Sequence, residues 1–305
     1  MALQLRIGIS GWNYKFWRGE FYPKGLVQKR ELEFASRQMN SIEINGTFYS
    51  LQRPSSYRKW HDETPADFIF AVKGPMYVTH RKRLKDVRQP LANFYASGVL
   101  QLGKKLGPVL WQFPPFLTYN RERMSAFLEL LPRTSAAASM LAHEHNLKKS
   151  DWIAPEAIAK TKIRYAFEPR HESFFCEDFV ELLREHNAAL VFADAAGKFP
   201  YAEDITSDLI YIRLHGSEEI YASGYRPDEL DRWASRMKKW RDGLQPSDAI
   251  RVSKKSFRPR EKRDVYVYFD NDIKVHAPFD AINLAARFGG AGPGGGQRPS
   301  RLDQI

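Results

Sequence analysis

The chain has 305 residues, of which 43% are hydrophobic, enough to build a sizeable core in one large domain or two smaller ones. No run of about 18 apolar residues occurs, which excludes a membrane-spanning helix. The single cysteine, Cys176, excludes an intramolecular disulfide. Lys and Arg number 47 against 36 Asp and Glu, and this net charge of +11 favours polyanionic partners such as nucleic acid or phosphorylated substrates.

The start of the chain bears on its location in the cell. Its first twelve residues, MALQLRIGISGW, lead directly into a strand-like segment and lack the basic and apolar regions of a signal peptide. A single cysteine also fits a reducing compartment. We therefore expect a cytoplasmic protein that does not bind membranes, and the oligomeric state is left open.

Short apolar runs, rich in β-branched and aromatic residues, alternate with helical patterns along the whole chain. They predict strands at residues 6–10, 41–48, 68–73, 108–113, 163–168, 188–194, 209–215 and 264–271. Most of these runs are continuously apolar, as parallel strands covered on both faces are.

Between the predicted strands, apolar residues recur at spacings of three and four. This pattern predicts amphipathic helices at residues 26–39, 90–106, 122–131, 176–186, 227–244 and 278–288. Strand–helix alternation over roughly 290 residues favours a single α/β domain, a (β/α)8 TIM-type barrel, over an open doubly wound sheet. No GxGxxG motif follows a predicted strand, and no P-loop motif occurs, which supports the barrel. Residues 195–208 show no helical pattern, so we expect the barrel to be irregular there.

Two segments fall outside this alternation, and the barrel domain is expected to span residues 1–288. Residues 289–305 are rich in glycine and poor in apolar side chains, so we expect disorder. Residues 245–263 form a basic insert before the last strand. Its plainest interpretation is a flexible loop near the N-terminal end of the barrel, although it could bind nucleic acid independently.

Polar side chains stand at the C-terminal ends of the predicted strands, where TIM barrels carry their active sites. In the second strand, alternation would place Glu43, Asn45, Thr47 and Tyr49 on one face. The other strand-end candidates are Lys73, with His80 in the loop that follows, Gln112, Glu168, Arg170, Asp194, Arg213, His215 and Asn271. Charged groups inside a barrel are costly unless they are paired or exposed to water. Two interpretations stay open, a water-filled site or an ion-pair network that only closes the barrel, and recurrence at one end favours the site.

Seven segments occur in the order SGWNYKFWRGEFYP, SIEINGTFY, FIFAVKGPMYVTH, GPVLWQFPP, FEPRHESF, YIRLHG and VYVYFDN. Together they resemble the pattern of the YecE-like family (domain of unknown function 72) from about residue 7 to residue 288. The resemblance implies a TIM-type barrel distantly similar to the endonuclease IV and xylose isomerase barrels, and it implies no particular reaction. The insert 245–263 looks longer than the family usually has. The positions that carry the family pattern are Trp12, Tyr14, Glu43, Asn45, Thr47, Tyr49, Lys73, His80, Gln112, Glu168, Arg170, Arg213, His215 and Asn271.

The first functional hypothesis is the binding or hydrolysis of a phosphate-containing substrate, nucleic acid included. Its anion-binding residues are Lys73, His80, Arg170 and Arg213. Residues that would orient the substrate by hydrogen bonds or stack on it are Trp12, Tyr14, Asn45, Thr47, Tyr49, Gln112 and Asn271. The basic loop at residues 80–88 would extend a positive track on the same face. The catalytic candidates are Glu43, Glu168 and His215.

Three alternatives stay open at this stage. One is metal-assisted hydrolysis or isomerisation, for which Glu43, Glu168, Asp194 and His215 are suitable ligands. Arg170 and Arg213 would repel a cation there, and no HExxH motif occurs, so neither a metal nor another cofactor is predicted. The second alternative is metal-free acid–base chemistry on a sugar or a small phosphorylated metabolite. The third is a pocket that binds an anionic small molecule or nucleic acid without turnover.

Overall fold

The computed structural model describes residues 4–255, 257–258 and 261–289. Its eight parallel strands close into a barrel in chain order, which confirms the TIM-type fold predicted from the sequence. The strands are β1 (Leu5–Ser10), β2 (Ser41–Ile44), β3 (Ile69–Lys73), β4 (Leu106–Gln112), β5 (Tyr165–Glu168), β6 (Ala189–Asp194), β7 (Leu209–Leu214) and β8 (Asp264–Phe269).

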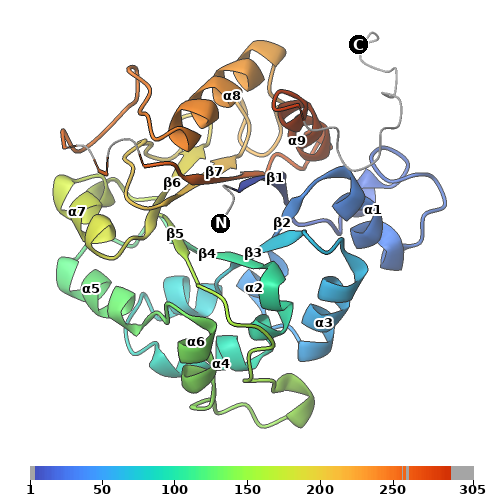
Figure 1. Ribbon diagram of the computed structural model, residues 1–305, viewed down its shortest axis with the longest axis vertical. Helices are drawn as coiled ribbons and strands as arrows, with labels where there is room; N and C mark the ends of the chain where they lie inside the picture. The colour runs from blue at the N-terminus through green and yellow to red at the C-terminus, as the bar shows by residue number, and fades with distance from the viewer. Residues whose placement is uncertain (1–3, 256, 259–260, 290–305) are drawn as a thin grey trace.

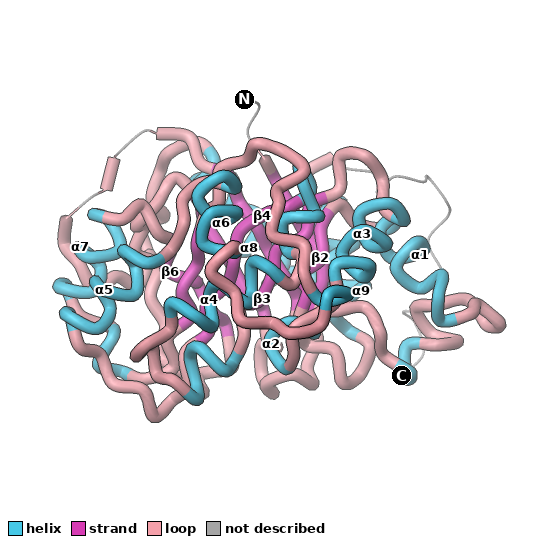
Figure 2. Tube along the Cα trace, turned by 90° about the horizontal axis from the view of Figure 1, so that it is seen from below, coloured by secondary structure: helices cyan, strands magenta, loops and turns pink. Residues whose placement is uncertain are grey.

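Helices surround the strands on the outside of the barrel (Figure 1). Within the described residues the α-helices are α1 (Glu31–Gln38), α2 (Gly46–Tyr49), α3 (Pro54–Glu63), α4 (Arg88–Ala96), α5 (Arg121–Leu130), α6 (Ser135–Ala142), α7 (Glu177–Glu185), α8 (Pro227–Arg241) and α9 (His276–Ala286). The short α2 follows β2 and lies below the strands in the side view, so it marks the C-terminal end of the barrel (Figure 2).

Each strand is buried on two faces, and the two faces belong to different clusters. The barrel interior is filled by Ile69, Ala71, Leu110, Ala166, Ala189, Val191, Ala193, Leu209, Tyr211, Tyr266 and Tyr268. The intervening residues, such as Ile42, Phe70 and Ile212, belong to a larger cluster packed between the strands and the helices. Burial on both faces is the physical reason for the continuously apolar strand pattern in the sequence.

The first two strands approach each other closely at Gly8. Gly8 pairs with Ser41, and a Cβ atom on Gly8 would lie 1.8 Å from the Ser41 carbonyl oxygen. Only glycine fits such an approach without moving the backbone. The same register places Ser10 level with Glu43 at the C-terminal end of the barrel.

The second strand is shorter than predicted, because the chain turns into α2 after Ile44. The expected alternation of Glu43, Asn45, Thr47 and Tyr49 along one strand face is therefore wrong. The Thr47 hydroxyl donates to the carbonyl of Ile44 at 3.0 Å and to that of Lys73 at 2.6 Å. These bonds to two neighbouring strands hold the turn, which local strand propensity did not reveal.

The single helix predicted at residues 90–106 is also wrong. Helix α4 ends at Ala96, and Gly98 then adopts a left-handed conformation with φ of 105°. A short helical segment, Val99–Lys105, follows and leads into β4. Helices α3 and α6, like α2, were not predicted: α3 buries only Pro54 and Tyr57, and α6 consists mainly of small and apolar residues without a clear polar face.

The connection between β6 and β7 contains no helix within residues 195–208, as predicted. The insert before β8 packs against this connection rather than lying free as expected. The backbone N–H groups of Val252 and Ser253 donate to the Asp204 carboxylate at 2.7 and 2.9 Å. Arg184 of α7 also donates to the Lys255 carbonyl at 3.0 Å.

The predicted disordered tail lies outside the described residues from position 290 onward.

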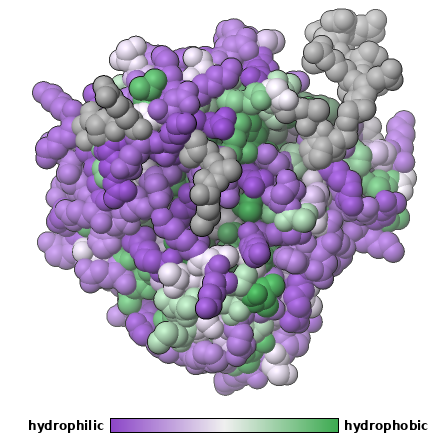
Figure 3. All heavy atoms as spheres, in the orientation of Figure 1, coloured by the Kyte–Doolittle hydropathy of each residue, from purple (hydrophilic) through white to green (hydrophobic). Residues whose placement is uncertain are grey.

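The face of the molecule seen along the barrel axis is largely hydrophilic (Figure 3). None of the described helices has the length and apolar character needed to cross a bilayer.

Candidate functional site

Arg213 of β7 lies at the centre of a polar cluster at the C-terminal end of the barrel. Its Nη2 donates to Glu43 Oε1 at 2.8 Å and to Asp270 Oδ2 at 2.9 Å, and its Nη1 donates to Glu168 Oε2 at 2.7 Å. Burial would lower the pKa of Arg213, but Glu43, Glu168 and Asp270 together raise it well above its usual value. Arg213 itself is fully buried, so it lies beneath the surface of the mouth.

Glu43 has no oxygen left for a ligand. Its Oε1 also accepts from the Ser10 hydroxyl at 2.7 Å, and its Oε2 accepts from the Tyr211 hydroxyl at 2.5 Å. Since its side chain is also fully buried, Glu43 anchors Arg213 inside the barrel.

Glu168 lies between two arginines. Its Oε1 accepts from Arg170 Nε at 2.9 Å and forms an ion pair with Arg170 Nη2 at 2.8 Å, while its Oε2 accepts from Arg213. Burial alone would raise the pKa of Glu168, but Arg213 and Arg170 outweigh it and hold the pKa well below its usual range. Glu168 is therefore ionised at neutral pH and carries no proton to donate.

Lys73, at the end of β3, has no acceptor for its amine among the described residues. The side chain is 7% exposed, and its Nζ lies 4.2 Å from the centre of the Phe48 ring. Burial and then the charge of Arg213 lower the pKa of Lys73 to about 8, although the nearby carboxylates act in the opposite direction. Lys73 is therefore mostly protonated at pH 7, with free N–H donors at the mouth.

Arg170 and Gln112 also present donors at the mouth. Arg170 Nη2 donates weakly to the Tyr221 hydroxyl at 3.3 Å, and the guanidinium packs on the Phe199 ring at 4.4 Å. Its Nη1 has no partner among the described residues, and its side chain is 12% exposed. The Gln112 amide, 6% exposed, likewise has no described partner.

The two predicted histidines differ in depth. His80 lies in the loop after β3, and burial followed by the charges of Lys73 and Arg170 lowers its pKa to about 4. It is therefore neutral at pH 7. His215 is fully buried, with its Nδ1 3.0 Å from Asp270 Oδ2, so it lies beneath the mouth beside Arg213.

Three predicted site residues do not reach the mouth. Trp12 packs edge-on against Trp60 of α3, with ring centres 5.3 Å apart. Asn271 Nδ2 donates to Asp280 of α9 at 2.8 Å, which fixes the end of β8 to that helix. The Thr47 hydroxyl is used by the backbone turn described above.

Three others lie near the mouth in different settings. The Tyr14 hydroxyl donates to the Ser10 carbonyl at 2.7 Å, and burial together with the Asp272 charge raises its pKa. Asn45 directly follows β2, and its buried Oδ1 has no partner among the described residues. Tyr49, on α2, is 75% exposed.

Two members of the cluster, Asp270 and Tyr211, were not predicted. Side chains alternate along a strand, and Tyr268 points into the barrel, so Asp270 points inward whereas Asn271 points outward. Counting in twos from Tyr268 would have selected Asp270. Tyr211 was not predicted because, in the sequence, a tyrosine in the middle of an apolar strand looks the same as a core residue.

A family model described as "Protein of unknown function DUF72" matches residues 6–301. The chain belongs to the DUF72 family. This confirms the resemblance to the YecE-like family found in the sequence.

The curated relatives of this DUF72 chain match over part of their length. UPF0759 protein YunF of Bacillus subtilis is 27% identical over 124 residues, which cover 39% of this chain and 43% of YunF. UPF0759 protein YecE of Escherichia coli is 27% identical over 129 residues, which cover 41% of this chain and 44% of YecE. The chain thus spans less than half the length of the curated relatives it matches.

Solved structures of DUF72 proteins share the fold. A DUF72 family protein of Thermotoga maritima has a TM-score of 0.68 at 24% identity, and the match covers 94% of this chain and 100% of that chain. A DUF72 family protein of Enterococcus faecalis has a TM-score of 0.66 at 16% identity, over 94% of this chain and 96% of that one. At these identities the likeness concerns the barrel fold.

A metal ion at the mouth of this DUF72 barrel would need several His, Cys, Asp or Glu side chains grouped as ligands. Within the described ranges, no three or more His, Cys, Asp and Glu side chains are grouped to hold one. Arg213 already occupies the space between Glu43 and Glu168, where a shared cation would have to lie. The expectation that no metal or other cofactor binds stays a prediction.

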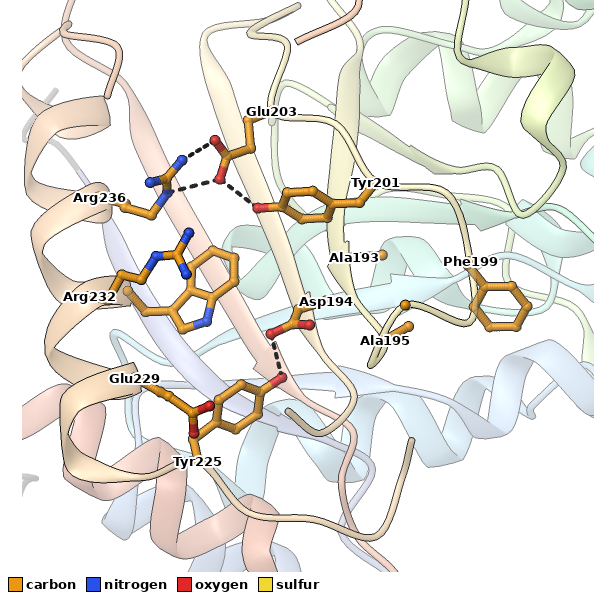
Figure 4. A pocket seen from close by; sticks show the side chains of 12 residues that line it. Ala193, Asp194, Ala195, Phe199, Tyr201, Glu203, Tyr225, Glu229, Arg232 and Arg236 are labelled. Atoms are coloured by element: carbon orange, nitrogen blue, oxygen red, sulfur yellow. Dashed lines mark hydrogen bonds and ion pairs between the residues drawn. The ribbon is translucent and has the colours of Figure 1, made fainter. Parts of the chain in front are cut away.

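A separate pocket of about 240 Å³ lies between α8 and the β6–β7 connection, where the barrel has no helix (Figure 4). Some of its lining residues pair with one another: Arg236 Nε donates to Glu203 at 2.9 Å, and the Tyr225 hydroxyl donates to Asp194 at 3.1 Å. Asp194 therefore lines this pocket rather than the mouth. Phe199 lines the pocket and also packs on Arg170, so the pocket and the mouth share one wall.

Proposed function

We propose that this DUF72 protein binds a phosphate-containing ligand at the mouth of its barrel. The proposal rests on an excess of N–H donors over free carboxylate acceptors at this end of the barrel. The cluster carboxylates Glu43, Glu168 and Asp270 are all engaged by arginine, hydroxyl or imidazole groups. Lys73 and Arg170, in contrast, keep N–H donors that no described group accepts. Cationic donors that the protein leaves unused are suited to bind anions.

The geometry of these donors fits phosphate better than a single carboxylate. Lys73 and Gln112 end the neighbouring strands β3 and β4, and Arg170 follows β5 by two residues, so all three donors belong to the C-terminal end of the barrel. A phosphate group has enough oxygens to accept from an ammonium, an amide and a guanidinium at once. Ionised Glu168 holds the Arg170 side chain in place from below.

Hydrolysis would also require a group that exchanges protons near neutral pH, and Glu168 does not meet this requirement because of its low pKa. We propose that Glu43, Glu168 and His215 instead fix the two arginines. The carboxyl group best suited to proton exchange is Asp272, just beyond β8, whose pKa is raised to about 6 by burial and by the charge of Asp270.

Calorimetric titration with pyrophosphate tests the binding proposal. The wild-type protein is expected to bind, and Lys73→Met is expected to weaken binding at least about tenfold because it removes a partly desolvated charge-assisted contact. A matched control is Lys239→Met, which removes an exposed lysine on α8. Thermal unfolding would verify that both variants are folded. Wild-type protein that does not bind pyrophosphate, or Lys73→Met that binds it normally, would overturn the proposal.

A further inference from the structure

Exposed rings stand on the barrel rim beside Lys73. Tyr49, on α2 after β2, is 75% exposed, and Phe116, in the loop after β4, is 57% exposed. His80 lies between them in the loop after β3 and is partly exposed. These three residues, named here the aromatic rim, all follow strands and therefore lie at the C-terminal end of the barrel.

The aromatic rim and Lys73 are connected through the buried ring of Phe48. The centre of the Phe48 ring lies 5.2 Å from that of Tyr49 and 5.1 Å from that of His80. The His80 and Phe116 ring centres are 6.3 Å apart. Lys73 Nζ lies 4.2 Å from the centre of the same Phe48 ring. A ligand phosphate held by Lys73 would therefore lie beside the exposed rings.

Positive charge continues from the rim into residues 81–85, which belong to the basic loop at residues 80–88. Arg81, Arg83 and Lys85 are exposed, and none of them forms an ion pair within the described part of the chain. The Arg83 guanidinium lies 5.2 Å from the centre of the Phe116 ring. Burial, followed by the charge of Arg83, lowers the pKa of neighbouring Arg123, so two unneutralised guanidinium groups flank this end of the rim.

We infer that the aromatic rim stacks the bases of a single-stranded nucleic acid whose phosphates contact the basic loop, with one phosphate in the mouth. The inference rests on the proposed function, because Lys73 and Arg170 supply the site for that last phosphate. Exposed rings beside free cations are the combination by which proteins bind single strands, since every base has a face that can stack. A duplex keeps its base faces covered and would leave these rings without a partner.

Fluorescence anisotropy with a labelled oligothymidylate of about 12 nucleotides tests the stacking. Phe116→Ala and Tyr49→Ala are each expected to weaken binding roughly tenfold. The matched control is Phe279→Ala, which removes a ring on α9 that is 38% exposed and packs against Phe21 rather than against the aromatic rim. Because all three side chains are exposed, the variants should unfold at nearly the wild-type temperature.

The salt dependence of the same binding tests the basic loop. Each single-strand phosphate contact adds about −0.7 to the slope of log K against log salt concentration. Arg83→Ala is therefore expected to make the slope shallower by about 0.7. Lys239→Ala on α8 serves as the control and should leave the slope unchanged.

Pyrophosphate titration of the same variants separates this inference from the proposed function. Phe116→Ala and Tyr49→Ala should bind pyrophosphate as the wild type does. If they also bind the oligonucleotide normally, or if a duplex of equal length binds as tightly as the single strand, base stacking on the rim is overturned while the mouth site stands. If the wild type does not bind pyrophosphate, the proposed function fails whatever the oligonucleotide does.

Discussion

The Lys73 ammonium lies 4.2 Å from the centre of the Phe48 ring, and no described carboxylate pairs with it. Arg213, a short distance deeper, is held by three carboxylates. At this end of the barrel Arg213 is therefore paired directly with carboxylates, whereas Lys73 has no carboxylate partner in contact. Changes at Lys73 should therefore affect anion binding, whereas changes at Arg213 should affect the stability of the fold.

Anion binding by Lys73 should fall as pH rises. Burial lowers the pKa of Lys73 to about 8, so the amine loses its proton as pH passes through that value. The affinity for sulfate, whose charge is constant over this range, is expected to drop about tenfold between pH 7 and pH 9. Calorimetry across this range would measure the change. Lys73→Arg, which keeps its charge, should give a flat profile, and a flat wild-type profile would contradict the assignment.

Arg213→Met should destabilise the protein without any ligand present. The substitution leaves Glu43, Glu168 and Asp270 without their shared partner inside the barrel. Removing one member of a buried ion pair typically costs about 3–5 kcal/mol, and urea denaturation would measure the loss. Arg58→Met, at an exposed position of α3, is the control. A cost below about 1 kcal/mol would show that the network does not close the barrel.

Glu168→Gln should lose stability in a pH-dependent way. The pKa of folded Glu168 is held below that of an unfolded glutamate, so its ionised form stabilises the fold above about pH 4.3. The difference in unfolding free energy from the wild type should be about 3 kcal/mol at pH 7. This difference should shrink progressively as pH falls below about 4.3 toward the folded pKa. Urea denaturation at pH 7 and pH 3 would test this, with exposed Glu20→Gln as control; a difference that grows in acid would refute it.

Gly8→Ala should disrupt the pairing of β1 and β2. The added Cβ would meet the Ser41 carbonyl oxygen at 1.8 Å, and backbone atoms on both strands would have to move. We expect a loss of about 3 kcal/mol or more, or failure to fold, measured by thermal unfolding. The matched control is Gly46→Ala, where the nearest atom lies 3.6 Å away on a flexible glutamine side chain. Equal stability of the two variants would contradict the close approach.

The sequence by itself determined the barrel and the end of it that carries charge. Both follow from local information: continuously apolar strands alternate with amphipathic helices, and polar residues such as Lys73, Glu168 and Arg213 recur where those strands stop. The order of the strands then brings those ends together whatever the details of pairing.

Only the tertiary structure decided which polar residues face a ligand. The ion pair between Arg213 and Glu43 joins residues 170 positions apart, so it depends on the register of every strand between them. A shift of one residue turns a side chain to the other face, which is why Asp270 rather than Asn271 enters the cluster. Burial and pairing likewise left Lys73 free and Arg213 fully engaged, although the two look alike in the sequence.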